Sequence, residues 1–311
     1  MKRTIAIFAL LICILLLPAC SKAQDNGTLS KQELKVGILP AESAIPIILA
    51  QEKGFFEEAG LNVSIKSFSS PNDRNVAVQA KELDAVIGDV MTAATFVDRG
   101  IPVKITSDIS EDFKILSSPD SGITKMEELS GKRISLVPNF ILEYIMDQFA
   151  AEYGFDYEIV EIPSFAGRSE ALMSNQIDGV VYTEPQAGML VNQGAHLLGS
   201  SKEAGIKGGA LLFTDEMTAN RSGDIKAFYQ AYNKAVDYMN GADVKEYSDI
   251  LTKYQFPDAI GAYLSNMGGT FAHAGTISED QFDSIVKWTK DKGQISKIYT
   301  YDELTDFSFV Q

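Results

Sequence analysis

The segment AQEKGFFEEAGLNV, residues 50–63, decides the fold class of this chain. Apolar residues recur within it and just upstream at roughly helical spacing, and polar residues lie between them. Gly60 suits the left-handed conformation that ends a helix, and from Leu61 onward apolar and polar residues alternate as in a strand. Because LKVGIL at residues 34–39 predicts another strand, the segment completes a βαβ unit, which begins a parallel sheet.

The alternation of strands and helices continues and then restarts in the middle of the chain. Strands are expected at 85–88, 103–109, 131–136, 157–162, 179–182, 195–198 and 207–213, and helices at 71–81, 91–99, 140–153, 167–173, 185–192 and 222–240. Two segments, 69–90 and 162–184, echo each other, because each places an arginine ten residues before an aspartate. This pattern predicts an α/β protein with two lobes of like, doubly wound topology.

Four phrases, in this order, carry a family resemblance: AQEKGFFEEAGLNV, ELD at 82–84, LSGKRI at 129–134 and YTEP at 182–185. They resemble the SsuA/THI5-like (NMT1) domain family, which includes the substrate-binding lipoproteins of nitrate/sulfonate/taurine-type ABC importers and binders of thiamine precursors. The resemblance spans roughly residues 34–240. It implies a two-lobed, periplasmic-binding-protein-like fold of type II, with mostly parallel sheets and the second lobe inserted into the first.

The division of the chain follows from this resemblance. We expect a signal peptide at 1–19, a lipid-anchored flexible linker at 20–33, the first part of lobe I at 34–112, lobe II at 113–211, and the return of lobe I with C-terminal helices at 212–311. A hinge near Asp112 and Ala210 would join the lobes. The C-terminal region has helical periodicity and no binding motif, so we expect extra helices packed on lobe I.

The N-terminus has the pattern of an export signal. Lys2 and Arg3 precede an apolar run at 5–17, which is shorter than the ~20 residues of a membrane-spanning helix. The following LPAC at 17–20 resembles the lipobox of bacterial lipoproteins, which implies acylation of Cys20 and a lipid anchor on the extracytoplasmic face of the cell membrane. An uncleaved anchor and an ordinary signal peptide with an unrelated cysteine are the alternatives.

Composition narrows the possible partners and chemistry. The chain has 42 acidic and 27 basic residues and a net charge of −15, so its surface is expected to repel nucleic acid and anionic lipid. Cys13 would leave with the signal peptide and Cys20 would be acylated, which excludes cysteine-based metal sites, redox chemistry and cysteine nucleophiles from the exported domain. We expect no metal site and no cofactor, and a monomer.

Candidate ligand-binding residues lie in the loops after the carboxyl ends of the predicted strands, where open parallel α/β sheets bind ligands. They are Glu42, Ser43, Ser70, Asp89, Thr92, Asn139, Phe140, Ser164, Tyr182 and Glu184. For three of them, Ser43, Ser70 and Asn139, helix capping is an alternative role. For the two aromatic residues the alternative is a place in the core, and for Glu184 it is a favourable charge in the first turn of a helix. Asp89 ends a central strand, where a buried carboxylate needs a partner, which favours ligand or interlobe hydrogen bonding.

Two arginines, Arg74 and Arg168, lie early in predicted helices, where a cation opposes the helix dipole. Each therefore needs a carboxylate. Asp73 and Glu170 are close enough in sequence that pairing within the protein is favoured over contact with a ligand. The acidic candidates at the mouth of the expected cleft fit an amine or an aminopyrimidine better than a bare sulfonate.

The resemblance implies an extracytoplasmic solute-binding component of an ABC importer, which captures a small nitrogen- or sulfur-containing nutrient and delivers it to permease and ATPase subunits. Catalysis is not expected, because the only histidines are His196 and His273 and the sequence has no nucleophile elbow, phosphate loop or metal-ligand spacing. Two alternatives remain open. One is a thiamine-pyrimidine or menaquinone-pathway enzyme on the same fold, and the other is a surface adhesion or sensor module.

Overall fold

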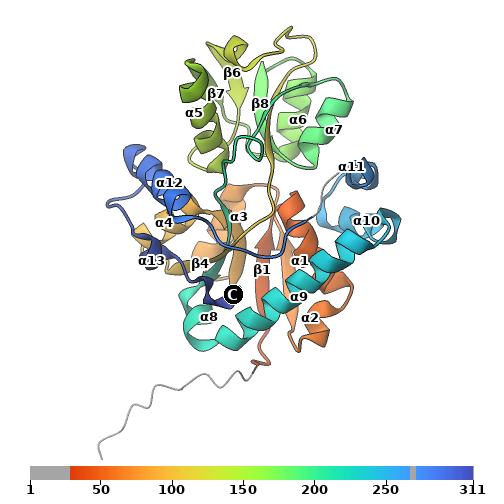
Figure 1. The fold of residues 1–311 in the computed structure, drawn as a ribbon, viewed down its shortest axis with the longest axis vertical. Helices are drawn as coiled ribbons and strands as arrows, with labels where there is room; N and C mark the ends of the chain where they lie inside the picture. Colours follow the sequence, from red (N-terminus) through yellow and green to blue (C-terminus); the bar gives the residue numbers. More distant parts are fainter. Residues whose placement is uncertain (1–28, 267–270, 311) are drawn as a thin grey trace, which may run out of the picture.

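The computed structural model describes residues 29–266 and 271–310, which form two lobes, each built around a five-stranded sheet (Figure 1). The predicted two-lobed α/β fold is confirmed. The chain enters lobe II after β4 (Val103–Asp108) and returns to lobe I at β10 (Gly209–Thr214). The predicted signal peptide and the lipidated Cys20 lie outside the described residues. Within the described ranges, no helix is long and apolar enough to cross a membrane.

The sheet of lobe I is mostly parallel, with one reversed strand. Its order is β2-β1-β3-β10-β4, in which β1 (Leu34–Ile38) pairs in parallel with both β2 (Val63–Ser67) and β3 (Ala85–Asp89). The returning strand β10 runs antiparallel to β3 and β4. The carboxyl ends of β1 and β3 therefore lie at the same edge of the sheet, where the candidate residues were expected.

Helices cover both faces of this sheet, so lobe I is doubly wound. Its helices are α1 (Ile45–Glu52), α2 (Phe55–Glu58), α3 (Pro71–Gln79), α4 (Val90–Asp98), α8 (Asp215–Asn220) and α9 (Ser222–Gly241). The buried residues of α1, α2 and α9 belong to one hydrophobic cluster, and those of α3 and α4 to another. The single helix expected before Gly60 is two helices, because Gly54 adopts the left-handed conformation with φ of 76° and interrupts it.

Lobe II repeats the topology of lobe I. Its strands are β5 (Phe113–Ser117), β6 (Lys132–Ser135), β7 (Tyr157–Val160), β8 (Gly179–Thr183) and β9 (His196–Ser200), in the order β7-β6-β8-β5-β9. Its helices are α5 (Ile141–Tyr153), α6 (Phe165–Met173) and α7 (Gln186–Asn192). Strand β5 was not predicted. It is the reversed strand of this sheet and pairs antiparallel with both β8 and β9.

The C-terminal region adds short helices and one long one. They are α10 (Ser248–Leu251), α11 (Ile260–Asn266), α12 (Glu279–Asp291) and α13 (Tyr301–Leu304), and the same region has the 3-10 turns η3 (Val244–Glu246), η4 (Thr252–Tyr254) and η5 (Phe307–Phe309). Two further 3-10 turns, η1 (Glu42–Ala44) and η2 (Met126–Leu129), lie earlier in the chain. Figure 1 shows α12 alongside α4 of lobe I. The same helix also contacts α5 of lobe II, through a hydrogen bond between Ser284 and Tyr144 and an edge-on contact of Trp288 with Tyr144. Helix α12 therefore contacts lobe II as well as lobe I.

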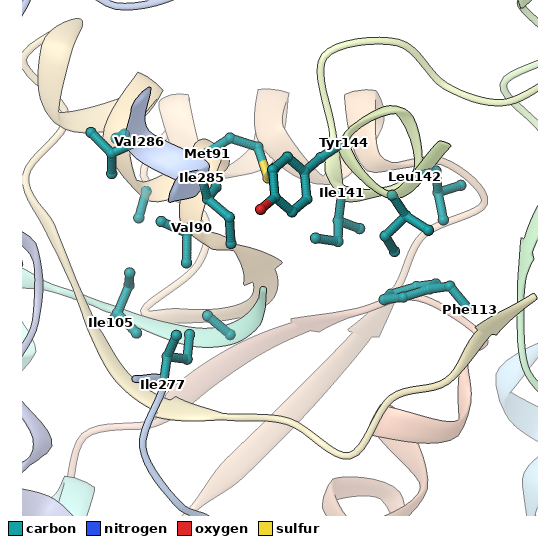
Figure 2. Close-up of a cluster of buried hydrophobic side chains, with 14 of the residues drawn as sticks. Val90, Met91, Ile105, Phe113, Ile141, Leu142, Tyr144, Ile277, Ile285 and Val286 are labelled. Carbon is teal, nitrogen blue, oxygen red and sulfur yellow. The ribbon is translucent and has the colours of Figure 1, made fainter. Parts of the chain in front are cut away.

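One hydrophobic cluster runs through both lobes at this junction (Figure 2). Met91 of α4, Ile141 of α5 and Ile285 of α12 are all buried within it. Phe113, the first residue of β5, belongs to the same cluster. Helix α12 therefore joins the two lobes as well as covering lobe I.

Candidate binding cleft

Two cavities lie between the lobes and share part of their walls. The first, the interlobe cavity, has a volume of about 80 Å³ and is lined by Leu39, Ala41, Glu42, Ser43, Pro71, Arg74, Ile87, Gly88, Asp89, Ile109, Glu111, Phe113, Val137, Phe140, Ile141, Leu142, Phe165, Arg168 and Thr183. The second, the hinge cavity, has a volume of about 280 Å³ and is lined by Glu42, Asp108, Ile109, Ser110, Glu111, Asp112, Lys114, Glu184, Lys202, Lys207, Tyr263, Phe271, Ala272 and His273. Because Glu42, Ile109 and Glu111 line both, the two cavities form one cleft with an apolar part and a charged part.

Asp89 connects the lobes through its carboxylate. Its Oδ1 accepts a hydrogen bond from the backbone N–H of Thr92 at 2.7 Å, which caps α4. Its Oδ2 accepts one from the N–H of Ile141 at 3.2 Å, at the start of α5, where Phe140 provides no side-chain cap of its own. Burial raises the pKa of Asp89, and the nearby Arg74 charge and these hydrogen bonds oppose the rise. One carboxylate therefore caps a helix in each lobe.

The Arg74 guanidinium is buried in the wall of the interlobe cavity. Its Nη1 donates to the carbonyl oxygen of Ile87 at 2.6 Å, and its Nε and Nη2 donate to Asn75 Oδ1 at 3.0 and 2.8 Å. Burial lowers the pKa of Arg74 to about 10, and the Asp89 carboxylate opposes this change. The favoured pairing with Asp73 is wrong, because among the described residues Arg74 donates to these oxygens and makes no ion pair with Asp73.

Arg168 holds the equivalent position in lobe II. Its Nη1 donates to the carbonyl oxygen of Ile162 at 3.1 Å, and its Cζ lies 5.0 Å from the ring centroids of both Phe165 and Tyr182. The side chain is buried, and its Nε has no hydrogen-bond partner among the described residues. Pairing with Glu170 was favoured from the sequence and does not occur in the described part of the chain. A buried cation with an unmatched N–H is costly, and a ligand acceptor would satisfy it.

Carboxylates also connect the two crossover segments, residues 109–112 and 201–208, in which the chain passes from one lobe to the other. Glu111 Oε1 accepts hydrogen bonds from the N–H groups of Gly208 and Gly209, both at 2.9 Å. Asp112 Oδ1 accepts one from Ser200 Oγ at 2.7 Å. Burial raises the pKa of Glu111 to about 7, although its two hydrogen bonds oppose the rise. The segments on which a hinge would turn are therefore cross-linked by side chains at the edge of the cleft.

A further contact joins the lobes at the loop that precedes α1. The N–H of Glu42 donates to the carbonyl oxygen of Glu184 at 2.8 Å, and Gln186 Nε2 donates to the carbonyl oxygen of Pro40 at 2.6 Å. Burial raises the pKa of Glu184, and a hydrogen bond from Gly188 opposes the rise. Together with the hydrogen bond from the N–H of Ile141 to Asp89, this contact gives the cleft two places where hydrogen bonds join the lobes.

The ten predicted site residues fall into four sets, and Glu42 and Phe140 each belong to two of them. Glu42, Ser43, Asp89 and Phe140 line the interlobe cavity, and Glu42 and Glu184 line the hinge cavity. Thr92 and Asn139 line a separate groove of about 370 Å³, which also has Phe140 in its wall. Ser70, Ser164 and Tyr182 line none of these three spaces. A role in binding stays a prediction for all ten.

The structural alternatives hold for some of these residues. Ser70 caps α3, accepting a hydrogen bond from the backbone N–H of Asp73. Ser164, for which capping was not given as an alternative, caps α6 in the same way through the N–H of Gly167. Ser43 caps no helix in the described chain, and Asn139 adopts φ of 70° in the loop before α5. Tyr182 is fully buried beneath the Arg168 guanidinium, where it supports that side chain.

Several cavity residues were absent from the prediction. Phe165 lies in a predicted strand-end loop, so its position could have been found from the same rule. Glu111 and Phe113 lie between the expected strands, in a segment for which no pattern indicated the reversed strand β5. Within the described ranges, no group of three or more His, Cys, Asp or Glu side chains is arranged to hold a metal ion.

Comparison with known proteins assigns the family. A family model described as NMT1/THI5 like matches residues 41–242, which is more than half of the chain. The chain belongs to this family. The match begins next to Glu42 and ends beyond α9, so it includes both crossover segments and most of the walls of the two cavities, while Leu39 and residues 263 and 271–273 of those walls lie outside it.

The curated relatives of this NMT1/THI5-like chain are enzymes. THI11 of Saccharomyces cerevisiae, a 4-amino-5-hydroxymethyl-2-methylpyrimidine phosphate synthase, is 27% identical over 235 residues, which cover 68% of each protein. Further synthases of the same name from this yeast match over the same length. The prediction that the chain is not an enzyme is therefore wrong, because members of its family are named for a catalysed reaction. That prediction relied on the presence of only two histidines and on the absence of known catalytic motifs, and neither observation excludes an enzyme.

Solved structures similar to this NMT1/THI5-like chain are binding proteins. The alkanesulfonate-binding protein SsuA from Xanthomonas axonopodis pv. citri aligns with a TM-score of 0.76 at 16% identity, over 89% of this chain and 99% of that one. A ligand-binding component of an ABC-type import system from Staphylococcus aureus aligns with the same score and identity, over 90% and 98%. Likeness at this identity supports the fold, which is that of two-lobed binding proteins.

Proposed function

We propose that the protein is an extracytoplasmic solute-binding component of an ABC importer. The observation that carries the proposal is the interlobe cavity, where Arg74 and Arg168 from different lobes are buried and, among the described residues, neither forms an ion pair within 4 Å of a carboxylate. A ligand held between them would stabilise the closed arrangement of the lobes, as in hinge-closing binding proteins. Glu42 in the same wall provides an acceptor for a ligand N–H group.

The proposed ligand is a small organic molecule that contains nitrogen or sulfur, of the nitrate, sulfonate or taurine class or the thiamine-pyrimidine class. The arginines suit an anionic or strongly accepting group, and the aromatic rings of Phe140 and Phe165 suit a flat one. A dissociation constant near 1 μM corresponds to about −8 kcal/mol, which a few buried hydrogen bonds and one stacking contact supply.

The same proposal includes the N-terminal region. Export through the signal peptide at 1–19, acylation of Cys20 and a linker to residue 33 would hold the binding domain beside its permease. The expected bounds of lobe II were 113–211, but β10 begins at Gly209 in the sheet of lobe I, so we place lobe II at 113–208 and lobe I at 34–112 and from residue 209 onward, with the hinge in the crossover segments. The closed form would be the one that permease and ATPase subunits recognise.

A thermal-shift screen followed by calorimetry tests this proposal. The panel is nitrate, taurine, alkanesulfonates, 4-amino-5-hydroxymethyl-2-methylpyrimidine and riboflavin. A ligand at a hundredfold excess over its dissociation constant adds about 2.7 kcal/mol to the free energy of unfolding, which raises Tm by several degrees. Arg74→Met and Arg168→Met should abolish the shift, whereas Arg99→Met, on the exposed end of α4, should retain it. If no compound of these classes binds, the proposed function fails.

A pyrimidine phosphate synthase is the second candidate, favoured by the sequence match to the yeast synthases over 235 residues. The discriminating experiment incubates purified protein with candidate precursors and follows the formation of 4-amino-5-hydroxymethyl-2-methylpyrimidine phosphate by mass spectrometry. Product that accumulates with time and protein concentration would replace the binding proposal with the catalytic one. Saturable binding without product would support the importer component.

A further inference from the structure

The Glu42 carboxyl group lies in the wall that the interlobe cavity and the hinge cavity share. Only 8% of the residue is exposed. Its backbone N–H is bonded to Glu184, but among the described residues its carboxyl oxygens have no hydrogen-bond donor and no ion-pair partner. A buried carboxyl group that lacks a partner is unusual, because an unpaired charge loses its hydration on burial.

The groups that face Glu42 come from five different segments. Three carboxylates act on it, Glu184 after β8 and Glu111 and Asp112 in the first crossover, and one cation, Lys202, comes from the second crossover. The charge of Glu42 also acts on the hydroxyl groups of Tyr263 in α11 and Tyr232 in α9, where it adds to the rise in their pKa values. The remaining charged or titratable groups of the hinge cavity are Asp108, Lys114, Lys207 and His273.

The lysines of the hinge cavity are largely engaged with other acids. Lys114 pairs with Asp112 at 2.5 Å, and Lys207 pairs with Asp108 at 3.5 Å. His273 is bonded to Asp237, outside the cavity wall. Lys202 is the cation that acts on Glu42 itself, while Lys114 also acts on Glu184 and Lys207 on Glu111. With five acidic side chains against three lysines in its wall, the cavity has more formal negative than positive charge.

Under these conditions the free protein keeps Glu42 protonated near neutral pH. Burial raises its pKa to about 8, and the charges of Glu184, Asp112 and Glu111 add to the rise. Glu111 itself is raised to about 7 and has one buried oxygen, Oε2, without a partner. Too few cations lie near Glu42 and Glu111 to balance their charges, so these two carboxyl groups retain protons instead.

We propose that the hinge cavity binds the cationic end of an organic ligand, a protonated amine or an amidinium, and that this cation displaces the proton of Glu42 to solvent. The inference rests on the proposed function, because it assumes that a ligand enters the cleft between the lobes. The exchange is balanced: the carboxyl O–H of Glu42 releases one proton to the buffer, and the resulting carboxylate pairs with the ligand's N–H groups. Binding in this cavity thus depends on pH through a group of the protein.

Benzamidine is the probe for this exchange, and neutral benzamide, of the same shape, is its matched control. Titration calorimetry at pH 7 in two buffers of different ionisation enthalpy measures the protons released on binding. For the wild-type protein we expect about one proton released per benzamidine bound. Benzamidine affinity should rise about tenfold per pH unit between pH 6 and 8, because deprotonation of Glu42 becomes easier. Benzamide should bind at least tenfold more weakly.

Two variants identify the group that exchanges the proton. Glu42→Gln should reduce both proton release and the pH dependence to near zero, and should weaken benzamidine binding at least tenfold. Glu57→Gln, an exposed glutamate in α2, should behave as the wild type. A second test uses infrared spectra and needs no ligand: at pH 7 the protonated carboxyl band of the free wild-type protein should lose most of its intensity in Glu42→Gln, in which Glu111 still contributes.

Three results would overturn the inference: no benzamidine binding, binding without proton release, or release that persists in Glu42→Gln. Identical infrared spectra of the wild-type protein and Glu42→Gln would also overturn the inference. Each differs from failure of the proposed function, which is the absence of binding for the nutrient panel. A panel compound that binds without proton exchange would retain the solute-binding function and remove the cation site.

Discussion

The carboxylate of Asp89, at the end of β3 in lobe I, accepts a hydrogen bond from the N–H of Ile141, the first residue of α5 in lobe II, at 3.2 Å. The same carboxylate caps α4 of its own lobe. Helix α5 thus receives at its N-terminus an acceptor that its own preceding residue does not provide. Separation of the lobes would break this bond and expose a helix start inside the cleft.

Asp89→Ala should destabilise the protein by about 1–2 kcal/mol, because it removes the acceptor at two helix starts. It should also weaken ligand binding, since Asp89 lines the interlobe cavity. Chemical denaturation and calorimetry measure the two effects. Thr300→Ala is the matched control, because it removes the cap of α13 without touching either cavity and should reduce stability alone. Unchanged ligand affinity in Asp89→Ala would remove this residue from the site.

Arg168→Lys should fold normally and lose at least tenfold in affinity for the ligand. The planar guanidinium packs against Phe165 and Tyr182 at once, whereas an ammonium group offers a single point of charge and no flat surface. Arg133→Lys, which changes a half-exposed arginine paired with Asp178, should leave affinity unchanged. Calorimetry with a ligand from the nutrient screen compares them, and equal affinity in both variants would contradict a ligand-binding role for Arg168.

Stability should fall as pH rises from about 4.5 to about 8, because Glu42 keeps its proton in the folded state and loses it on unfolding. The size of this contribution is at most about 5 kcal/mol over that range. Glu42→Gln mimics the protonated form, so it should match the wild type near pH 5 and exceed it in stability at pH 8. Urea denaturation across this range measures the difference, and parallel curves for both proteins would refute it.

Lys292→Met should loosen the junction between α12 and α5. Lys292 Nζ pairs with Glu143 Oε1 at 2.6 Å and with Asp147 Oδ2 at 2.9 Å, and its loss leaves the buried Glu143 without a cation. We expect a loss of about 1–3 kcal/mol in unfolding free energy. Lys287→Met removes an exposed pair with Asp291 within the same helix and should cost less than about 0.5 kcal/mol. Similar losses for the two variants would argue against a joining role for Lys292.

Cys20→Ala should release the exported protein from the membrane fraction, because the proposed acyl chains attach to that thiol. Fractionation of cells that express the full chain, with mass spectrometry of the mature N-terminus, provides the measurement. Cys13→Ala changes a cysteine within the signal peptide and should leave the location unchanged. A membrane-bound Cys20→Ala protein would refute the lipid anchor.

The fold was predictable because local patterns and the βαβ rule determine most of it. The sequence around Gly60, the repeated arginine–aspartate spacing and YTEP at 182–185 led to two lobes with mostly parallel sheets. Strand β5 escaped prediction, because FKILS lacks strict alternation and its partners β8 and β9 lie far along the chain. The break at Gly54 was also missed, since helical periodicity continues across it.

The site was predictable only in part, because contact between the lobes decides which side chains are buried. Strand-end loops pointed to Glu42, Asp89 and Phe140, which do line the interlobe cavity. Sequence proximity gave the wrong partners for Arg74 and Arg168, since each guanidinium turns to backbone carbonyls and aromatic or amide groups in the cleft. No local pattern reveals that a side chain will be enclosed by a distant part of the chain.

The placement of Trp288 gives the protein an intrinsic optical signal. It is the only tryptophan in the sequence, it stands on α12, and its Nε1 donates to Asp147 of the other lobe at 2.9 Å. Indole emission responds to polarity and to nearby quenching groups, and both change if α5 moves away from α12. Unlabelled protein in a fluorimeter can therefore report lobe movement in real time, through one chromophore whose origin is unambiguous.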